Sequence, residues 1–189
     1  MVRSLQCFFA ALLLAIPSGL DAAALQLGEI HRLTFRDVDG NDLSTADGHV
    51  TIVVVVTRRS EEQARQISKL VPERCIGDPK YRYITLVNFQ KSLAAPLQGI
   101  TRAIIRRRLD GEAKALQPRY AARNIARDPR RDVYVVADFN GAAVSRLGLA
   151  PESQEVAVFV FDGAGTLVDH WSGIPPEESL AKAIAAAER

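Results

Sequence analysis

The chain has 189 residues, of which 48% are hydrophobic and 24% are charged, and its formal net charge at pH 7 is +2. This ordinary composition excludes a low-complexity or largely disordered chain. The small net charge gives no global electrostatic reason to expect nucleic acid as a partner.

Residues 1–24 have the pattern of a secretory signal peptide. Arg3 precedes about eleven largely apolar residues, and the alanines at 22–24 offer small side chains to a peptidase. An uncleaved membrane anchor is the alternative, but the apolar run is shorter than the roughly 20 residues that a spanning helix needs. We therefore expect a periplasmic or secreted protein in which residues 25–189 form a single domain, with no transmembrane segment.

Beyond this leader the sequence contains one cysteine, Cys75. An internal disulfide is then impossible, even in the oxidising compartment that export implies. Arg74 precedes Cys75 and could lower the pKa of its thiol, which would favour capture of a thiol on a partner. The alternative is a small apolar side chain filling space near a helix end, since no second cysteine or histidine is adjacent.

The first part of the domain predicts a hairpin, a buried strand and a helix. Residues 31–35 alternate in polarity and lead into an Asp-Gly turn at 39–40. The continuous apolar centre of 49–57 predicts a central, parallel strand that is covered on both faces. A helix follows from Ser60, where S-x-x-Q fits a capping box, and it ends near Pro72.

The rest of the domain continues the alternation of strands and helices. Residues 81–89 predict a second long strand, and 92–108 and 111–126 have helical patterns, with Pro118 suggesting a break or a new start. The later elements are a strand at 133–137, a short helix at 141–147, a strand at 156–162, a turn at 162–165 leading into a hairpin strand, and a helix from Pro175 that buries Leu180, Ala183, Ile184 and Ala187. This order predicts an α/β domain with helices on both faces of a mixed sheet.

Several stretches resemble the thioredoxin-like superfamily, in the branch of exported TlpA-type proteins and alkyl hydroperoxide reductase-like peroxiredoxins. They include VTIVVVV entering a helix, VYVVADFNGAAVSRLGL, and VAVFVFDGAGTLVDHWSGIPPEESL. The resemblance covers nearly all of residues 25–189 and implies a three-layer sandwich. Val87-Asn88 and the segment 151–153 (Pro-Glu-Ser) are similar to YtfJ-type proteins, which are small exported proteins of this fold without a redox motif or an established activity.

The resemblance also implies that the catalytic positions of the superfamily are substituted here. Redox-active relatives open the first helix with C-x-x-C, and the matching residues of this chain are Glu61 and Ala64. Peroxiredoxins read P-x-x-x-T-x-x-C at the same junction, where this chain has Val53, Thr57 and Ser60. A serine hydroxyl cannot replace the thiolate in peroxide chemistry, so we interpret Ser60 as a helix N-cap.

A second substitution concerns the loop that faces the redox motif. Active relatives have a cis-proline immediately before the facing strand, and the matching position here is about Val156. The nearest proline, Pro151, lies five residues earlier, and we expect it to shape a turn instead.

The most distinctive local feature is basic. Between residues 100 and 131, ten cations stand against three acidic residues, for a local charge of +7. The cations are Arg102, Arg106, Arg107, Arg108, Lys114, Arg119, Arg123, Arg127, Arg130 and Arg131. Spacings of four place Arg119, Arg123 and Arg127 on one helical stripe, which could bind an acidic protein or an anionic surface. The alternative is a solvated helix face paired with acids elsewhere in the chain.

Other candidate sites have weaker patterns. Arg58 and Arg59, next to the helix start at Ser60, could bind a small anion. The three histidines are scattered without metal-ligand spacing, so no metal and no cofactor is expected. Asp138, Asp162 and Asp169 fall at strand ends or turns, where aspartate is common.

These patterns predict an exported, redox-inactive thioredoxin-fold protein that acts as a binding or accessory module in the cell envelope. Its expected partner is an envelope protein or an anionic surface such as a membrane, and nucleic acid is not expected. The alternative is a thiol-dependent redox protein that uses Cys75 with a partner thiol.

Overall fold

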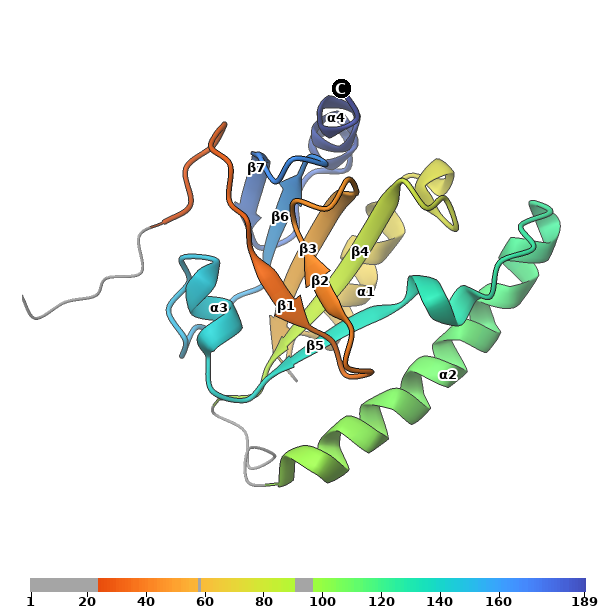
Figure 1. Cartoon of the computed structure of the whole chain (residues 1–189), viewed down its shortest axis with the longest axis horizontal. Coiled ribbons are helices and arrows are strands. Elements are labelled where there is room, and N and C mark those ends of the chain that lie inside the picture. The colour runs from red at the N-terminus through yellow and green to blue at the C-terminus, as the bar shows by residue number, and fades with distance from the viewer. Residues whose placement is uncertain (1–23, 58, 91–96) are drawn as a thin grey trace, which may run out of the picture.

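The computed structural model describes residues 24–57, 59–90 and 97–189. The expected signal peptide therefore lies almost entirely outside the described residues. A five-stranded sheet forms the centre, in the order β5-β4-β3-β6-β7 (Figure 1). Its strands are β3 (Val50–Thr57), β4 (Tyr81–Asn88), β5 (Tyr134–Asp138), β6 (Ala157–Phe161) and β7 (Leu167–Ser172). β3, β4 and β5 are parallel, whereas β6 and β7 are antiparallel, which confirms the predicted mixed sheet with residues 49–57 at its centre.

The predicted N-terminal hairpin forms a separate two-stranded sheet of β1 (Thr34–Arg36) and β2 (Asp42–Ser44). Its turn is closed by Asp37, whose Oδ1 accepts hydrogen bonds from the amides of Asp39 and Asn41 at 2.9 and 2.8 Å. Gly40 has a φ of +93°, a conformation that favours glycine.

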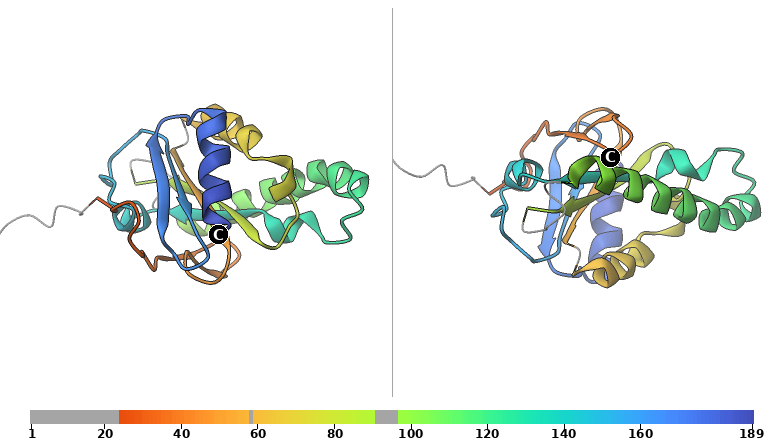
Figure 2. Two further views of the ribbon diagram at one scale, coloured as in Figure 1. Left: turned by 90° about the horizontal axis from the view of Figure 1, so that it is seen from above. Right: turned by 90° about the horizontal axis from the view of Figure 1, so that it is seen from below.

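One face of the central sheet is covered over β3, β4 and β6. The β1–β2 hairpin and the short helix α3 (Ala142–Arg146) pack on it, and Figure 2 shows α3 on the opposite side of the sheet from α4. On β4 this face presents Ile84 and Leu86, both 0% exposed. We call it the closed face.

The opposite face is covered only in part. Helices α1 (Glu61–Leu70) and α4 (Glu177–Ala187) pack over β3 and β6, and α4 buries the four residues predicted from its spacing. β4 presents Tyr83, Thr85 and Val87 on this side, and each remains partly exposed. We call it the open face.

The prediction of separate helices at 92–108 and 111–126 with a break or new start at Pro118 is wrong, because α2 (Gln98–Ala122) is one helix of 25 residues with Pro118 inside it. Proline removes one helical hydrogen bond, but this position is exposed and the helix is fixed on both sides of it. Leu109 packs against the sheet edge before the proline, and buried Tyr120 donates its hydroxyl to Asp132 of η3 (Pro129–Asp132) at 2.8 Å after it. The predicted start at Ser92 lies outside the described residues. Every helix in the described ranges is too short or too polar to cross a bilayer.

Candidate functional site

The junction of β3 and α1 contains the residues that match the catalytic positions of the resembling family. Ser60 is buried, and its Oγ accepts a hydrogen bond from the Thr57 amide at 2.7 Å and donates to the Thr57 carbonyl at 3.2 Å. The side chain makes no capping hydrogen bond to α1, so the predicted capping box is wrong. The cause is local, because the Ser60 hydroxyl forms its hydrogen bonds with the backbone of Thr57, within the turn, and not with the first amides of α1.

Among the residues that the structure describes, this arrangement gives the hydroxyl no activating partner. A serine nucleophile needs an adjacent general base, and the hydrogen bonds of Ser60 Oγ lie within its own turn. Glu61, on the first turn of α1, forms an exposed ion pair with Arg65 at 3.2 Å, and Ala64 packs against the core under α1. The junction is therefore built as a structural turn.

The candidate anion site at this junction is only partly described. Arg58 lies outside the described residues. Arg59 is exposed, and its amide donates to Thr57 Oγ1 at 3.3 Å. The two hydroxyls of the turn thus accept from the amides of Thr57 and Arg59 and not from the first amides of α1.

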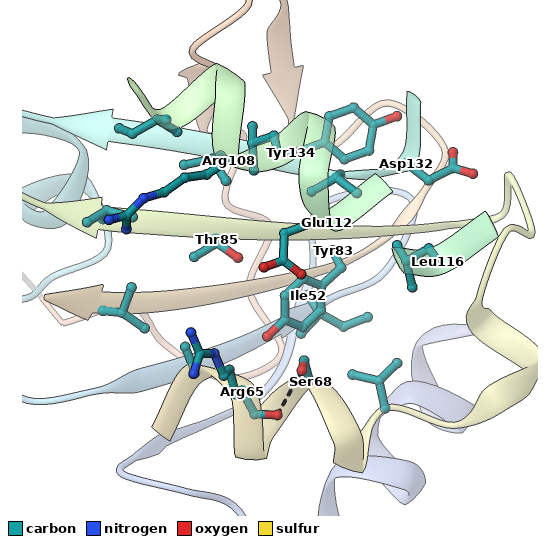
Figure 3. Close-up of a pocket in the computed structure, with 18 of the residues that line it drawn as sticks. Ile52, Arg65, Ser68, Tyr83, Thr85, Arg108, Glu112, Leu116, Asp132 and Tyr134 are labelled. Carbon is teal, nitrogen blue, oxygen red and sulfur yellow. Dashed lines mark hydrogen bonds between the residues drawn. The ribbon is translucent and has the colours of Figure 1, made fainter. Parts of the chain in front are cut away.

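A groove with a volume of about 680 Å³ runs from this junction between α1 and α2. Its floor is the open face of β4, and Figure 3 shows Tyr83 and Thr85 lying between side chains of α1 on one side and of α2 on the other. Apolar residues of β3, β4 and α2 complete the lining: Ile52, Val56, Val87, Ile104, Ile105, Leu109 and Leu116. Its size is in the range of known ligand pockets.

The groove exists because α2 packs against the edge of the sheet and leaves the open face of β4 uncovered. Ile105 and Leu109 of α2 contact Val135 of β5 and Val38 of the hairpin loop. The other faces of α2 are exposed, and Ile104, on the groove side, has 53% of its surface accessible. The sequence predicted α2 as helix but gave no signal for this displaced position.

Several polar groups that line the groove have no hydrogen-bond or ion-pair partner among the described residues. Four of them lie on the floor strand β4 and on α2: the hydroxyls of Tyr83 and Thr85, and the charged groups of Arg108 and Glu112. Burial raises the pKa of the Tyr83 hydroxyl, so this group remains a hydrogen-bond donor at neutral pH. The arginine of the opposite wall, Arg65, is instead paired with carboxylates of its own helix.

Cys75 lies in the short helix η1 (Glu73–Cys75), at the far end of the groove. It is a free thiol with 7% exposure. Burial raises its pKa to about 11, and this outweighs the opposite effect of Arg74. Arg74 is in turn engaged with Glu188 at 2.7 Å. These properties are those of an unreactive thiol.

The predicted arginine stripe is engaged within the protein. Arg119 forms an ion pair with Glu73, and Arg123 Nη1 donates to the carbonyls of Glu73 and Ile76 at 2.6 and 2.8 Å. Arg127 pairs with Asp132 at 2.8 Å. The three side chains therefore fix the C-terminal part of α2 and the chain that follows it.

Asp138 and Asp162 serve a helix start and a turn, whereas Asp169 lies inside β7, so its predicted place at a strand end or turn is wrong. Asp138 Oδ2 accepts the Val144 amide at 2.9 Å, Asp162 Oδ1 accepts the Thr166 amide at 2.7 Å, and Asp169 Oδ1 accepts the His170 amide at 2.8 Å. No group of three or more potential metal ligands occurs within the described ranges.

The loop before β6 also differs from the pattern of active relatives. All peptide bonds of the described residues are trans. Pro151 lies in a turn, as predicted, and its carbonyl accepts a hydrogen bond from Asn88 Nδ2 at 2.7 Å. The sequence did not predict this tether between the end of β4 and the turn.

The architecture defines a thioredoxin-like fold, and solved structures with similar architecture agree. A peroxiredoxin-like protein from Aquifex aeolicus is 13% identical with a TM-score of 0.52, over 87% of this chain and 88% of its own. A putative protein disulfide isomerase from Bacteroides thetaiotaomicron is 11% identical with a TM-score of 0.52, over 87% and 89%. The exposed lipoprotein thioredoxin of Streptococcus pneumoniae is 11% identical with a TM-score of 0.50, over 82% and 98%.

At these identities the likeness defines the fold and not the activity. The sequence matches no protein-family model and no curated protein.

Proposed function

We propose that this is an exported, redox-inactive thioredoxin-fold protein of the YtfJ type, which binds a ligand or partner of the cell envelope in the groove between α1 and α2. The observation that carries the proposal is the contrast at the start of this groove. The hydroxyl of Ser60, at the matching nucleophile position, is enclosed in its own turn, while the adjacent open face of β4 is accessible.

The thiol-dependent alternative has less support. A thiol exchanges as its thiolate, and Cys75 is buried with a pKa of about 11. Attachment to an anionic surface through Arg119, Arg123 and Arg127 would have to compete with the internal partners of these side chains.

The first experiment tests redox inactivity. Purified protein lacking residues 1–24 is assayed for insulin reduction and for hydrogen peroxide consumption, beside its Cys75→Ser variant. We expect both proteins to give the rate of the buffer alone. A wild-type rate similar to that of a thioredoxin or peroxiredoxin would overturn the proposal.

The second experiment tests the groove in cells that produce the protein. A photo-crosslinking amino acid is placed at Ile104 on the groove wall or, as a matched control, at Ile174, which is 40% exposed and does not line the groove. We expect a specific adduct at position 104 only. Equal labelling at both positions would contradict a binding role for the groove.

A further inference from the structure

We propose that the ligand of the groove is an extended peptide segment with apolar side chains and little net charge, about five residues of which lie along β4. This inference deepens the proposed binding function and rests on it. The groove is apolar on its floor and walls, yet its unpartnered polar groups are distributed along it and not gathered at one end.

Residues that carry hydroxyls recur along the floor at the interval of an extended polypeptide. Tyr83 and Thr85 are two residues apart on one face of β4, so their Cα atoms are separated by roughly 6.6 Å along the strand. The longer tyrosine side chain carries its hydroxyl further from the sheet than the threonine does. An extended peptide has carbonyl groups all along its length, so carbonyls of a bound segment can accept hydrogen bonds from both hydroxyls, with Val87 continuing the row as an apolar contact.

The wall formed by α2 repeats this spacing with opposite charges. Arg108 and Glu112 are four residues apart on the helix, roughly 6 Å along its axis. A guanidinium can donate to a peptide carbonyl and a carboxylate can accept from a peptide N–H. Because the two charges cancel, they favour neither an anionic nor a cationic ligand, and a segment with little net charge is the complementary one.

The peptide cannot bind by adding a strand to the sheet. β4 is hydrogen-bonded to β3 on one side and to β5 on the other, so its backbone groups are occupied. A ligand on the open face must be held by side chains, and the hydroxyl and charged groups are the side chains available there. Their interval, rather than a free sheet edge, selects the extended conformation.

A single-chain lipid fits the same groove less well. Its polar atoms are gathered in one head group, so its apolar tail would cover the hydroxyls of Tyr83 and Thr85 and the carboxylate of Glu112 without giving them partners. Buried polar groups without partners are costly. The distribution of the four groups therefore favours a peptide.

The test uses two fluorescent probes with the purified protein. One is an end-blocked, fluorescein-labelled heptapeptide with leucine at alternate positions and serine between, compared with the all-serine peptide. The other is a dansyl-labelled single-chain fatty acid. We expect saturable binding of the leucine peptide, at least about tenfold tighter than the serine peptide, and no competition by the fatty acid.

Variants locate the site. Tyr83→Phe combined with Thr85→Val removes the two hydroxyls with little change of volume and should weaken peptide binding about tenfold or more. Ile104→Asp should weaken it by a similar factor, whereas the matched surface change Ile174→Asp should leave it unchanged. Thermal unfolding of each variant verifies that the fold is retained.

The outcomes separate this inference from the function on which it rests. Binding of the fatty acid that is lost in Ile104→Asp, without binding of the peptide, would overturn the peptide inference and keep the groove as a binding site. Peptide binding that is unchanged in the variant without both hydroxyls would overturn the proposed recognition. Redox activity of the wild-type protein would overturn the proposed function itself.

Discussion

The two faces of strand β4 differ in how far they are covered. Ile84 and Leu86 point to the closed face and are completely buried, whereas Tyr83 and Thr85, which alternate with them, remain accessible on the open face. One strand therefore contributes to the core with half of its side chains and to the floor of a groove with the other half. Substitutions in the same segment can change the core and the groove separately.

The difference comes from the elements that cover each face. On the closed face, the hairpin and α3 place large side chains such as Phe35 and Leu147 against the sheet. On the open face, α1 and α4 cover β3 and β6, while α2 lies at the edge beside β5 (Figure 1). The same fold thus provides a rigid support on one side and an accessible surface on the other.

The largest effect should come from the closed face. Leu86→Ala removes a fully buried side chain and leaves a cavity, so the free energy of unfolding should fall by about 3 kcal/mol. Val87→Ala, on the open face, should cost about 1 kcal/mol because that side chain is already partly exposed. Urea unfolding measures both, and equal losses would contradict the distinction between the faces.

The next largest effect concerns the thiol at the end of the groove. Burial raises the pKa of Cys75 to about 11, whereas the ordinary value is 9.0. At neutral pH the thiolate fraction is then about one hundredfold below that of an unperturbed cysteine. Iodoacetamide should therefore modify the native protein at least about one hundredfold more slowly than the unfolded protein. Mass spectrometry over time measures both rates. Similar rates in the native and unfolded protein would show that Cys75 is a reactive thiol.

A charged pair on the closed side should have a smaller effect. Arg82 is buried, and its Nη1 donates to Asp47 Oδ2 at 2.6 Å. Asp47→Asn leaves the Arg82 guanidinium without its counterion, so the free energy of unfolding should fall by about 2 kcal/mol. This loss is smaller than the loss expected for a fully buried ion pair, because Asp47 is partly exposed. Asp42→Asn is the control, since its pair with Arg36 is exposed and 4.0 Å long.

The pH dependence of this pair has a defined sign. Burial raises the pKa of Asp47, but hydrogen bonds from Arg82 and His49 outweigh it and hold the pKa below the usual 3.8. The stabilisation is therefore present above pH 3.8 and is lost as the pH falls through the lower folded-state pKa. The difference in unfolding free energy between wild type and Asp47→Asn should shrink below about pH 4. A constant difference down to pH 2 would show that the charge of Asp47 is not what stabilises Arg82.

The order of the strands could be predicted because each strand carries a local signal. The β-branched run at 49–57 indicated burial on both faces, and the alternation at 31–35 with the Asp-Gly turn indicated a hairpin. These signals depend on side chains a few residues apart. Ser60 shows the limit of such reasoning, because its hydroxyl had two local uses, a cap and a turn, and the turn is formed.

The groove could not be predicted because it depends on where α2 lies relative to the sheet. That position is set by contacts between residues far apart in sequence, such as Leu109 with Val38 and Arg123 with Glu73. One feature of the sequence does agree with the groove: Tyr83 and Thr85 carry hydroxyls on the same face of a predicted strand. Hydroxyls on such a face need either partners or water, so they indicate a face that is accessible.

The smallest expected change in stability concerns the arginines of α2, of which some contact neighbouring segments and others do not. Arg123→Ala removes the hydrogen bonds to the Glu73 and Ile76 carbonyls and should lower stability by about 1 kcal/mol, because these contacts are largely exposed. Arg107→Ala is the matched control, since Arg107 has no hydrogen bond or ion pair in the part of the chain that the structure describes, and it should change stability by less than about 0.5 kcal/mol.

This last comparison also tests how the groove is kept open. If Arg123 fixes the C-terminal part of α2, amide hydrogen exchange of residues 119–122 should be faster in Arg123→Ala and unchanged in Arg107→Ala. If both variants exchange as the wild type does, the position of α2 depends on Leu109 and Tyr120 instead. The wall of the groove would then be held by burial on the sheet side, and the arginines would contribute only to its charge.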